Sequence, residues 1–279
     1  MKNILVPCDF SEQSVNAFRF GLGIARKSKG MVHLVHIIEL PVVHDSVFMP
    51  VLSFEEVFLK ELKEKAEKAF GKLIGKYATR TDKVSHHVLF GATFRMLTDY
   101  ITNESVDLVI MGTKGATGAR EILVGSNTEK VVRRSPVPVI AVKKHVEPDS
   151  IKNIVFPNTL DTEKQEDLVM RVKALQDFFK ATLHIVWINT PTNFTPDRIT
   201  AQRLEAFAKR FMFKNYTINV YNDPYEESGI INFTHSINAD MIAMGTHGRK
   251  GIAHVLAGSI AEEVVNHVDC PIWTCSLKK

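Results

Sequence analysis

Cysteine is scarce in this sequence: its 279 residues include only Cys8, Cys270 and Cys275. Cysteines at these positions form neither a disulfide framework nor a C-x-x-C metal pair. A small secreted domain held together by disulfide bonds is therefore excluded, and we expect a protein of the reducing cytoplasm.

Long apolar runs and a strong charge of one sign are also missing. No run approaches the roughly 18–20 apolar residues that span a bilayer, and the segment before Pro7 is too short for the apolar core of a signal peptide. The net charge of +4 is too small to indicate a nucleic-acid surface by itself. We therefore expect no membrane segment and no nucleic-acid partner.

What the sequence does contain is a repeat of itself. Short segments recur in the same order in its two halves: NILVPCDFS (3–11) and NIVFPNTLD (153–161), MVHLVHII (31–38) and ATLHIVWI (181–188), SVDLVIMGTKG (105–115) and NADMIAMGTHG (238–248), and PVPVIAV (136–142) and CPIWTCS (270–276). A length of roughly twice a typical domain agrees with a tandem duplication. The polar stretch KKHVEPDS (143–150) marks the boundary, so we predict domains at 1–146 and 147–279.

Each half alternates short apolar strands with amphipathic helices. In the first half, strands are expected at 3–7, 31–38, 84–90, 106–111 and 137–142. Helical spacing relates the apolar residues Phe54, Phe58, Leu62, Ala66, Ala69 and Phe70. In the second half, Thr195 is expected as an N-cap, with Pro196 as the first helical residue. Nearly continuous apolar strands between helices predict an α/β fold with a parallel sheet covered on both faces.

Glycines follow the fourth strand of each half at the same intervals, in the pattern G-x2-G-x9-G-[ST]. The first copy consists of Gly112, Gly115, Gly125 and Ser126, and the second of Gly245, Gly248, Gly258 and Ser259. A glycine at the end of a strand permits a sharp turn or the close approach of a ligand. Each serine lies three residues before a glutamate, as in a capping box, and a helix start favours an anion. The repeated spacing predicts a phosphate-binding loop, although inheritance of a simple connection by both halves is an alternative.

Asp9 lies at the carboxyl end of the first strand, where parallel sheets bind ligands. Its carboxylate is suited to accept a hydrogen bond from a ribose hydroxyl or an adenine amino group. Alternatively, Asp9 caps the following helix, a role that Ser11 can also fill. The second half aligns Thr159 with Asp9, so we expect the second site to bind more weakly or to be reshaped for another nucleotide.

Together these residues resemble the universal stress protein family. The resemblance covers both halves and rests on ILVPCDFS, on the VHLVHII strand and on both glycine loops. It implies two tandem Rossmann-like (adenine-nucleotide alpha-hydrolase-like) domains, each a five-stranded parallel sheet with helices on both faces. It also implies ATP, with or without Mg²⁺, at the loops. Domains of this kind pair through their last strands, within one chain or in a homodimer.

Prolines flank the last strands of both halves, at Pro136, Pro138 and Pro271. Proline suits the start of a strand that joins its counterpart, but it also suits an edge strand that discourages pairing. Both interpretations are open at the level of sequence.

The resemblance also assigns nucleotide-binding residues, with Asp9 at the adenosine and the backbone of Ile37 at the adenine. The first site would comprise Pro7, Asp9, Ile37, Met111, Gly112, Gly115, Gly125, Ser126 and Asn127. The second site would comprise Ile188, Met244, Gly245, Gly248, Gly258, Ser259 and Ile260. No catalytic residue is expected.

Three classes of function are open: a nucleotide-binding regulatory protein, a slow ATPase or phosphotransferase, and an interaction scaffold whose loops are vestigial. Hydrolysis needs a metal-binding acid and a group that orients water, and the loops offer only Glu121 and His247. We therefore favour the regulatory class, without efficient catalysis.

Metal binding is not expected from the histidines or cysteines. His33 and His36 face opposite sides of one strand, and so do His86 and His87, because side chains alternate along a strand. No zinc site follows from such pairs. Cys8 is read as a small buried thiol, with oxidant sensing as the alternative.

Overall fold

The protein is described by a computed structural model. The structure describes residues 1–39, 52–113, 126–160, 165–246 and 260–276, and only the backbone of 52–56, 126, 127 and 262. The chain divides into two compact units, Met1–Gly112 and Thr113–Lys279. The two units divide at Gly112 and not near residue 146, because the last strand of the first repeat pairs with a strand of the second unit. The predicted domain boundary near residue 146 therefore stays a prediction.

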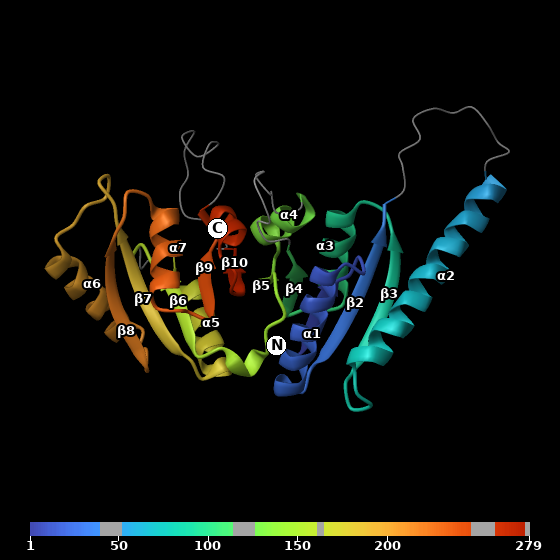
Figure 1. Ribbon diagram of the computed structural model, residues 1–279, viewed down its shortest axis with the longest axis horizontal. Coiled ribbons are helices and arrows are strands. Elements are labelled where there is room, and N and C mark those ends of the chain that lie inside the picture. The colour runs from blue at the N-terminus through green and yellow to red at the C-terminus, as the bar shows by residue number, and fades with distance from the viewer. Residues whose placement is uncertain (40–51, 114–125, 161–164, 247–259, 277–279) are drawn as a thin grey trace. The chain divides into compact units, whose positions relative to one another are not determined.

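The first unit is an α/β layer structure with a parallel sheet. Its elements are β1 (Asn3–Pro7), α1 (Glu12–Ser28), β2 (Met31–Ile38), α2 (Leu52–Tyr77), β3 (Val84–Phe90), α3 (Thr93–Asn103) and β4 (Leu108–Gly112). The strands lie in the order β3-β2-β1-β4 and all neighbours are parallel (Figure 1). The order of the strands therefore reverses at β1, which lies between β2 and β4.

Helices cover both faces of this sheet, as the apolar character of its strands predicts. Gly21 of α1 packs against Val6, and Phe70 of α2 lies 5.1 Å from the ring of His86, so these helices share one face. His33 contacts Tyr100 of α3 on the other face, with ring centroids 5.9 Å apart. Strand alternation produces the two faces.

The second unit contains the last two elements of the first repeat and the whole second repeat. Its elements are α4 (Ser126–Arg134), β5 (Val139–Val142), a 3₁₀ turn (Pro148–Ser150), β6 (Asn153–Pro157), α5 (Glu166–Phe179), β7 (Thr182–Asn189), α6 (Asp197–Arg210), β8 (Tyr216–Asn222), α7 (Glu226–Ser236), β9 (Met241–Gly245), α8 (Ile260–His267) and β10 (Ile272–Cys275). The strand order is β5-β10-β9-β6-β7-β8, parallel except for β5 with β10. The predicted α/β class is confirmed.

The two repeats agree in detail. Asp107 accepts bonds from the N–H groups of Lys2 and Asn3 at the start of β1, and Asp240 accepts the same pair of bonds at the start of β6. The alignment of the second strands differs by one residue from the sequence comparison, which matched 31–38 with 181–188. Asn3 pairs with Met31, whereas the equivalent Asn153 pairs with Thr182. The second strands of the repeats therefore match one residue later than the letters alone indicate.

The last strands of the repeats pair with each other. Ile272 lies opposite Ala141, and Thr274 lies opposite Val139, in an antiparallel ladder. On its other side, β10 pairs with β9, so β10 is not an edge strand. Pro138 and Pro271 immediately precede the strands, where a missing N–H costs no ladder bond. The edge interpretation of the prolines is wrong for β10.

The polar stretch after β5 is packed rather than free. The ammonium group of Lys143 is buried and donates to the carbonyl of Asn266 at 2.7 Å, near the carboxyl end of α8. Burial lowers the pKa of Lys143. Lys144 pairs with Asp269 at 2.6 Å. A cation at a helix carboxyl end is favoured by the helix dipole, so these lysines fasten β5 to α8.

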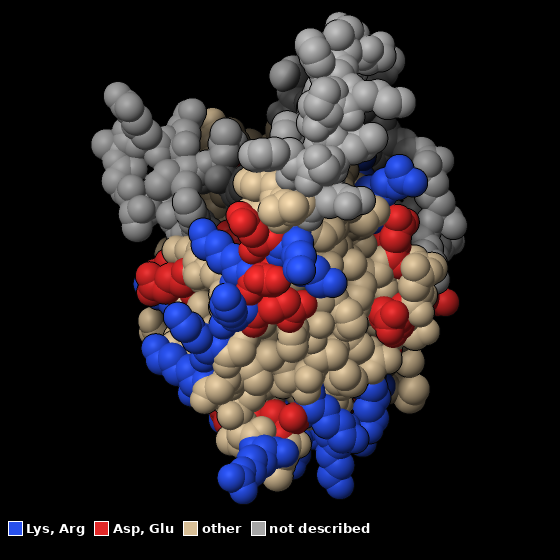
Figure 2. Space-filling model, turned by 90° about the vertical axis from the view of Figure 1, so that its right-hand side faces the viewer, with Lys and Arg blue, Asp and Glu red and all other residues tan. Residues whose placement is uncertain are grey.

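Two helices differ from the sequence-based expectations. In α2, Ala66 and Phe70 are buried but Phe58 is 54% exposed, so the apolar stripe covers the sheet only along its carboxyl-terminal part. Figure 2 shows basic and acidic side chains side by side on this face of the first unit. In α6, the N-cap is Pro196 and not Thr195, whose N–H and C=O are both held by the amide of Asn189.

Asp82 allows the stability of the first unit to be tested through pH. Arg26 donates to both carboxylate oxygens, at 2.8 and 2.7 Å. These bonds from Arg26, reinforced by Thr79 against the effect of burial, lower the pKa of Asp82 from 3.8 to about 2. The pair therefore stabilises the fold above pH 3.8, and its contribution is lost as the pH falls through about 2.

We expect Asp82→Asn to lower the free energy of unfolding by about 1–2 kcal/mol at pH 7, a value reduced because Arg26 is half exposed. Urea denaturation at pH 7 and near pH 2 measures the difference, which should disappear at the lower pH. Asp99→Asn is the matched control, since the exposed Arg95–Asp99 contact is 3.8 Å long. Equal effects of both substitutions would contradict the prediction.

Candidate functional site

The candidate site of the first unit lies at the carboxyl ends of β1, β2 and β4. Strand order reverses between β1 and β4, and open parallel sheets bind ligands at such a reversal. The chain leaves β1 at Pro7 and enters α1 at Glu12, which places the predicted residue Asp9 at this edge. We call this region the first crevice.

Asp9 is an exposed, ionised acceptor in the first crevice. Its Oδ1 accepts hydrogen bonds from the N–H of Ser11 at 3.0 Å and from the hydroxyl of Ser11 at 2.5 Å. Burial raises the pKa of Asp9, but the bonds from Ser11 outweigh it, so the pKa lies below the ordinary value. The helix cap itself is Ser11, whose hydroxyl accepts from the N–H of Ser14. The capping alternative for Asp9 is therefore wrong.

Ile37 presents its backbone to the first crevice. The carbonyl of Val35 accepts from the N–H of Cys8 at 2.8 Å, and the carbonyl of Ile38 accepts from the N–H of Gly91, beside β3. Backbone groups alternate in direction along a strand, so those of Ile37 point the same way as those of Val35. Because β1 ends level with Val35, the N–H and C=O of Ile37 face the space beyond the end of β1.

The first crevice is bordered by an aromatic cluster, and the sequence did not indicate this cluster. Phe10 adopts a left-handed conformation with φ 65°, and its ring lies 4.9 Å from that of His36 and 5.0 Å from that of Phe70. The Nδ1 atom of His36 lies 2.7 Å from the carbonyl oxygen of Cys8. Phe10 and His36 thus fix the turn that carries Asp9. Their only sequence signal is adjacency to predicted site residues.

Gly112 has a packing role at the end of β4. A Cβ atom built there would lie 2.3 Å from the carbonyl carbon of Gln13 and 2.6 Å from the N atom of Ser14, both in the backbone of α1. The neighbouring Met111 is also buried. The start of α1 therefore requires a residue without a side chain at position 112, and a contact of the Gly112 backbone with a ligand stays a prediction.

Most of the glycine loops lie outside the described residues. Gly115, Gly125, Gly248, Gly258 and Ser259 fall there, together with Glu121 and His247. Ser126 and Asn127 are described by their backbone alone, at the start of α4. Phosphate binding by these residues stays a prediction.

The second crevice has the same backbone geometry. The carbonyl of Val186 accepts from the N–H of Asn158, and that of Asn189 accepts from the N–H of Asp223. The backbone of Ile188 therefore faces the space beyond the end of β6, as Ile37 does beyond β1. The remaining described residues predicted for this site are Met244 and Gly245 at the end of β9 and Ile260 at the start of α8.

The polar groups differ between the crevices. In the place of Asp9 the second crevice has Thr159, whose hydroxyl accepts from the amide of Gln165 at 2.8 Å. Gln165 in turn accepts from the amide of Asn158 at 2.9 Å. The predicted loss of the acid is thus accompanied by a buried amide network that sequence comparison did not show.

Histidines and thiols take structural positions in this fold. His33 and His87 contact Tyr100 of α3, whereas His86 contacts Phe70 of α2, as strand alternation predicts. Burial raises the pKa of the Cys8 thiol, which disfavours the reactive thiolate. Within the described ranges, no group of three His, Cys, Asp or Glu side chains is arranged to hold a metal ion. The same ranges contain no helix with the length and apolar character needed to cross a bilayer.

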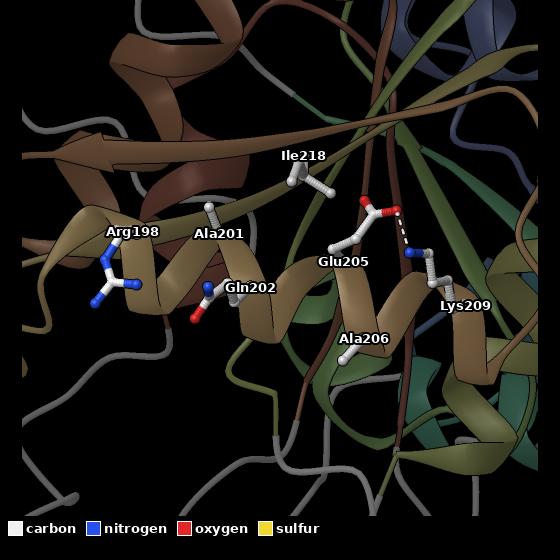
Figure 3. A pocket seen from close by; sticks show the side chains of 7 residues that line it. All are labelled: Arg198, Ala201, Gln202, Glu205, Ala206, Lys209 and Ile218. Atoms are coloured by element: carbon white, nitrogen blue, oxygen red, sulfur yellow. Dashed lines mark ion pairs between the residues drawn. The ribbon is translucent and has the colours of Figure 1, made fainter.

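A shallow groove of about 560 Å³ lies elsewhere, between α6 and β8 (Figure 3). It is lined by Arg198, Ala201, Gln202, Glu205, Ala206, Lys209 and Ile218. Glu205 and Lys209 form an ion pair within it at 3.3 Å. The groove follows the side of an edge strand and not the carboxyl ends of the strands, so the parallel-sheet rule does not place a nucleotide there.

Comparison with known proteins agrees with this architecture. Residues 1–143 and 200–276 match the universal stress protein family. The universal stress protein MJ0577 of Methanocaldococcus jannaschii is 32% identical over 154 residues, covering 51% of this chain and 95% of that protein. MJ0531 of the same organism is 29% identical over 143 residues, covering 51% and 82%. These relatives each match about half of the chain.

A crystal structure with a similar overall fold is also known. A universal stress protein from Archaeoglobus fulgidus DSM 4304 has a TM-score of 0.76 and 21% identity, with 98% of both chains covered. Its likeness concerns the fold. Because the family match extends over most of the residues in both repeats, the chain belongs to the universal stress protein family.

Proposed function

We propose that the first crevice binds ATP and that nucleotide occupancy regulates what the protein contacts. The observation that carries the proposal is that the Ile37 backbone and the ionised Asp9 both lie at the carboxyl end of β1. A backbone N–H and C=O pair matches the donor and acceptor edge of adenine, and a carboxylate accepts from an amino or hydroxyl group. Both belong to the carboxyl edge of a sheet at its point of strand reversal.

The phosphates are assigned to the loop after β4 and the start of α4. The N–H groups of a helix start favour anions, and the family resemblance implies the same residues, Gly112, Gly115, Gly125, Ser126 and Asn127. Because a Cβ at Gly112 would meet the backbone of α1, Gly112 would contribute its backbone alone.

The position of the acid in the first crevice favours a regulatory role over catalysis. Phosphoryl transfer needs groups that hold the metal and orient the nucleophile. Asp9 is tied to Ser11 beside the expected adenosine, at the wrong end of the nucleotide for this purpose. A slow ATPase and a scaffold are the competing functions.

Analysis of the purified intact protein separates these functions. Mass spectrometry of the small molecules released on denaturation should identify ATP or ADP, and calorimetry of nucleotide-free protein should show ATP binding without turnover over hours. Absence of both bound nucleotide and ATP binding would favour the scaffold. Steady release of phosphate that Glu121→Ala abolishes would favour the enzyme.

A further inference from the structure

The outermost strand of the second unit, β8, has an open edge. It pairs with β7 on one side, and no strand of the described part of the chain lies on its other side (Figure 1). None of its seven residues is buried. The outward N–H and C=O groups of such a strand are a template for pairing with another chain.

Two hydrogen bonds to β7 fix the direction of the backbone groups along β8. The carbonyl of Asn215 accepts from the N–H of Leu183, and the N–H of Asp223 donates to the carbonyl of Asn189. Backbone groups alternate in direction along a strand, so those of the odd-numbered residues point toward β7. The residues whose groups point away from the sheet are Tyr216, Ile218, Val220 and Asn222.

The side chains of β8 do not protect this edge. The strand reads YTINVYN and contains no charged residue, proline or glycine, whereas natural edge strands are commonly protected by charges, prolines or bulges. Its aromatic and β-branched residues favour pairing. Ile218 lines the groove beside α6 together with the small side chains of Ala201 and Ala206, so there is room next to the strand on this side (Figure 3).

The edge strand of the first unit, β3, differs from β8 in this respect. The third residue of β3 is His86, and the third residue of β8 is Ile218. The Nε2 atom of His86 lies 2.7 Å from a carboxylate oxygen of Glu67 on α2, and the neighbouring His87 is also exposed. A polar, partly charged pair therefore guards β3 where β8 presents an isoleucine, and pairing is favoured at β8.

We infer that β8 is a docking surface for a second copy of this chain, with the two β8 strands antiparallel about a twofold axis at Asn219. Asn219 is the middle residue of the strand, so this register uses its whole length and places Ile218 opposite the partner's Val220. The edge is uncharged and its outward residues are symmetric about Asn219, which suits an identical strand better than a charged partner.

The contacts available in this register are sufficient for a specific interface. The four outward residues of each copy can form about eight backbone hydrogen bonds, close to the roughly ten of a typical interface. The Ile218–Val220 pairs would add apolar cross-strand contacts on the face that carries α6. The chain already joins its own repeats by an antiparallel ladder of this type, between β5 and β10. The pairing at β8 is separate from that ladder.

Sedimentation of the intact protein across the micromolar range tests the inference. The mass should rise with concentration from 31.4 kDa to twice this value. Val220→Pro removes an outward N–H without a loss of any bond to β7, and it should weaken dimerisation at least about tenfold. Val88→Pro is the matched control, because Val88 is the fifth residue of β3 as Val220 is of β8. This control should dimerise as the original protein does.

Hydrogen exchange of the unaltered protein gives a second readout that does not depend on the folding of a variant. The amides of Ile218 and Val220 should exchange more slowly as the concentration rises, whereas those of His86 and Val88 should not change. A protein that stays monomeric throughout, or a dimer in which the Ile218 and Val220 amides are unprotected, would overturn the inference. Dimerisation that survives Val220→Pro, or that Val88→Pro weakens equally, would overturn it too.

Discussion

Gly112→Ala should destabilise the first unit by about 2–3 kcal/mol, in the upper range for overpacking. The substitution adds a single methyl group, whose carbon would lie 2.3 and 2.4 Å from the carbonyl group of Gln13. These are backbone atoms of the first turn of α1 and cannot rotate away as a side chain would. Relief requires α1 to move relative to β4, and Gly21 already packs this helix closely against β1. Urea denaturation followed by circular dichroism measures the loss.

Gly71→Ala provides the matched control. Gly71 lies in α2 with no atom within 4 Å of the position of the added Cβ. Alanine is the better helix former, so this variant should be stabilised by about 0.5–1 kcal/mol. If both variants are as stable as the original protein, the close packing of β4 on α1 is contradicted. A loss of ATP binding in a Gly112 variant would not identify a ligand contact, because the fold itself changes.

Asp9→Asn should weaken ATP binding about 10- to 100-fold, the usual range for a hydrogen bond to a charged group. The substitution is nearly isosteric. The asparagine Oδ1 can still accept both bonds from Ser11, so the turn before α1 should remain intact. The other carboxylate oxygen, Oδ2, is replaced by an amide nitrogen. This nitrogen is a donor, so it opposes the ligand donor whose hydrogen bond the carboxylate would have accepted. Calorimetry with ATP measures the affinity, and thermal denaturation verifies the fold.

Asp99→Asn is the corresponding control for binding. Asp99 is an exposed residue of α3 with a long contact to Arg95, so ATP affinity should not change. Should Asp9→Asn bind ATP as tightly as the original protein, the carboxylate takes no part in recognition. The proposed site would then depend on the backbone of Ile37 and the loop alone.

The strands were predictable because their signals are local. The first three strands of the first half have the predicted bounds, 3–7, 31–38 and 84–90, and the alternating faces of the strand histidines follow from period two alone. The duplication predicted the repeated architecture. The pairing of β5 with β10 was implied by the family resemblance, and it appears in the structure as an antiparallel ladder within the second unit.

The remaining features depend on contacts between residues distant in sequence. Gly112 is crowded by Gln13 of α1, a contact that no spacing rule contains. The amide of Asn189 holds Thr195 outside α6 and so moves the helix start. Phe58 matches the helical stripe of α2 but lies beyond the surface that the sheet covers. In the second crevice, loss of the acid was readable from Thr159, but the path of hydrogen bonds from Leu160 to Gln165 was not.

A crystal structure of the intact protein with ATP tests the central claim most directly. The account predicts adenine with its hydrogen-bonding edge at the N–H and C=O of Ile37 and the Asp9 carboxylate within hydrogen-bond distance of an adenosine donor. The phosphates should lie at the start of α4. ATP in the groove between α6 and β8, or a first crevice that stays empty at saturating ATP, would contradict it.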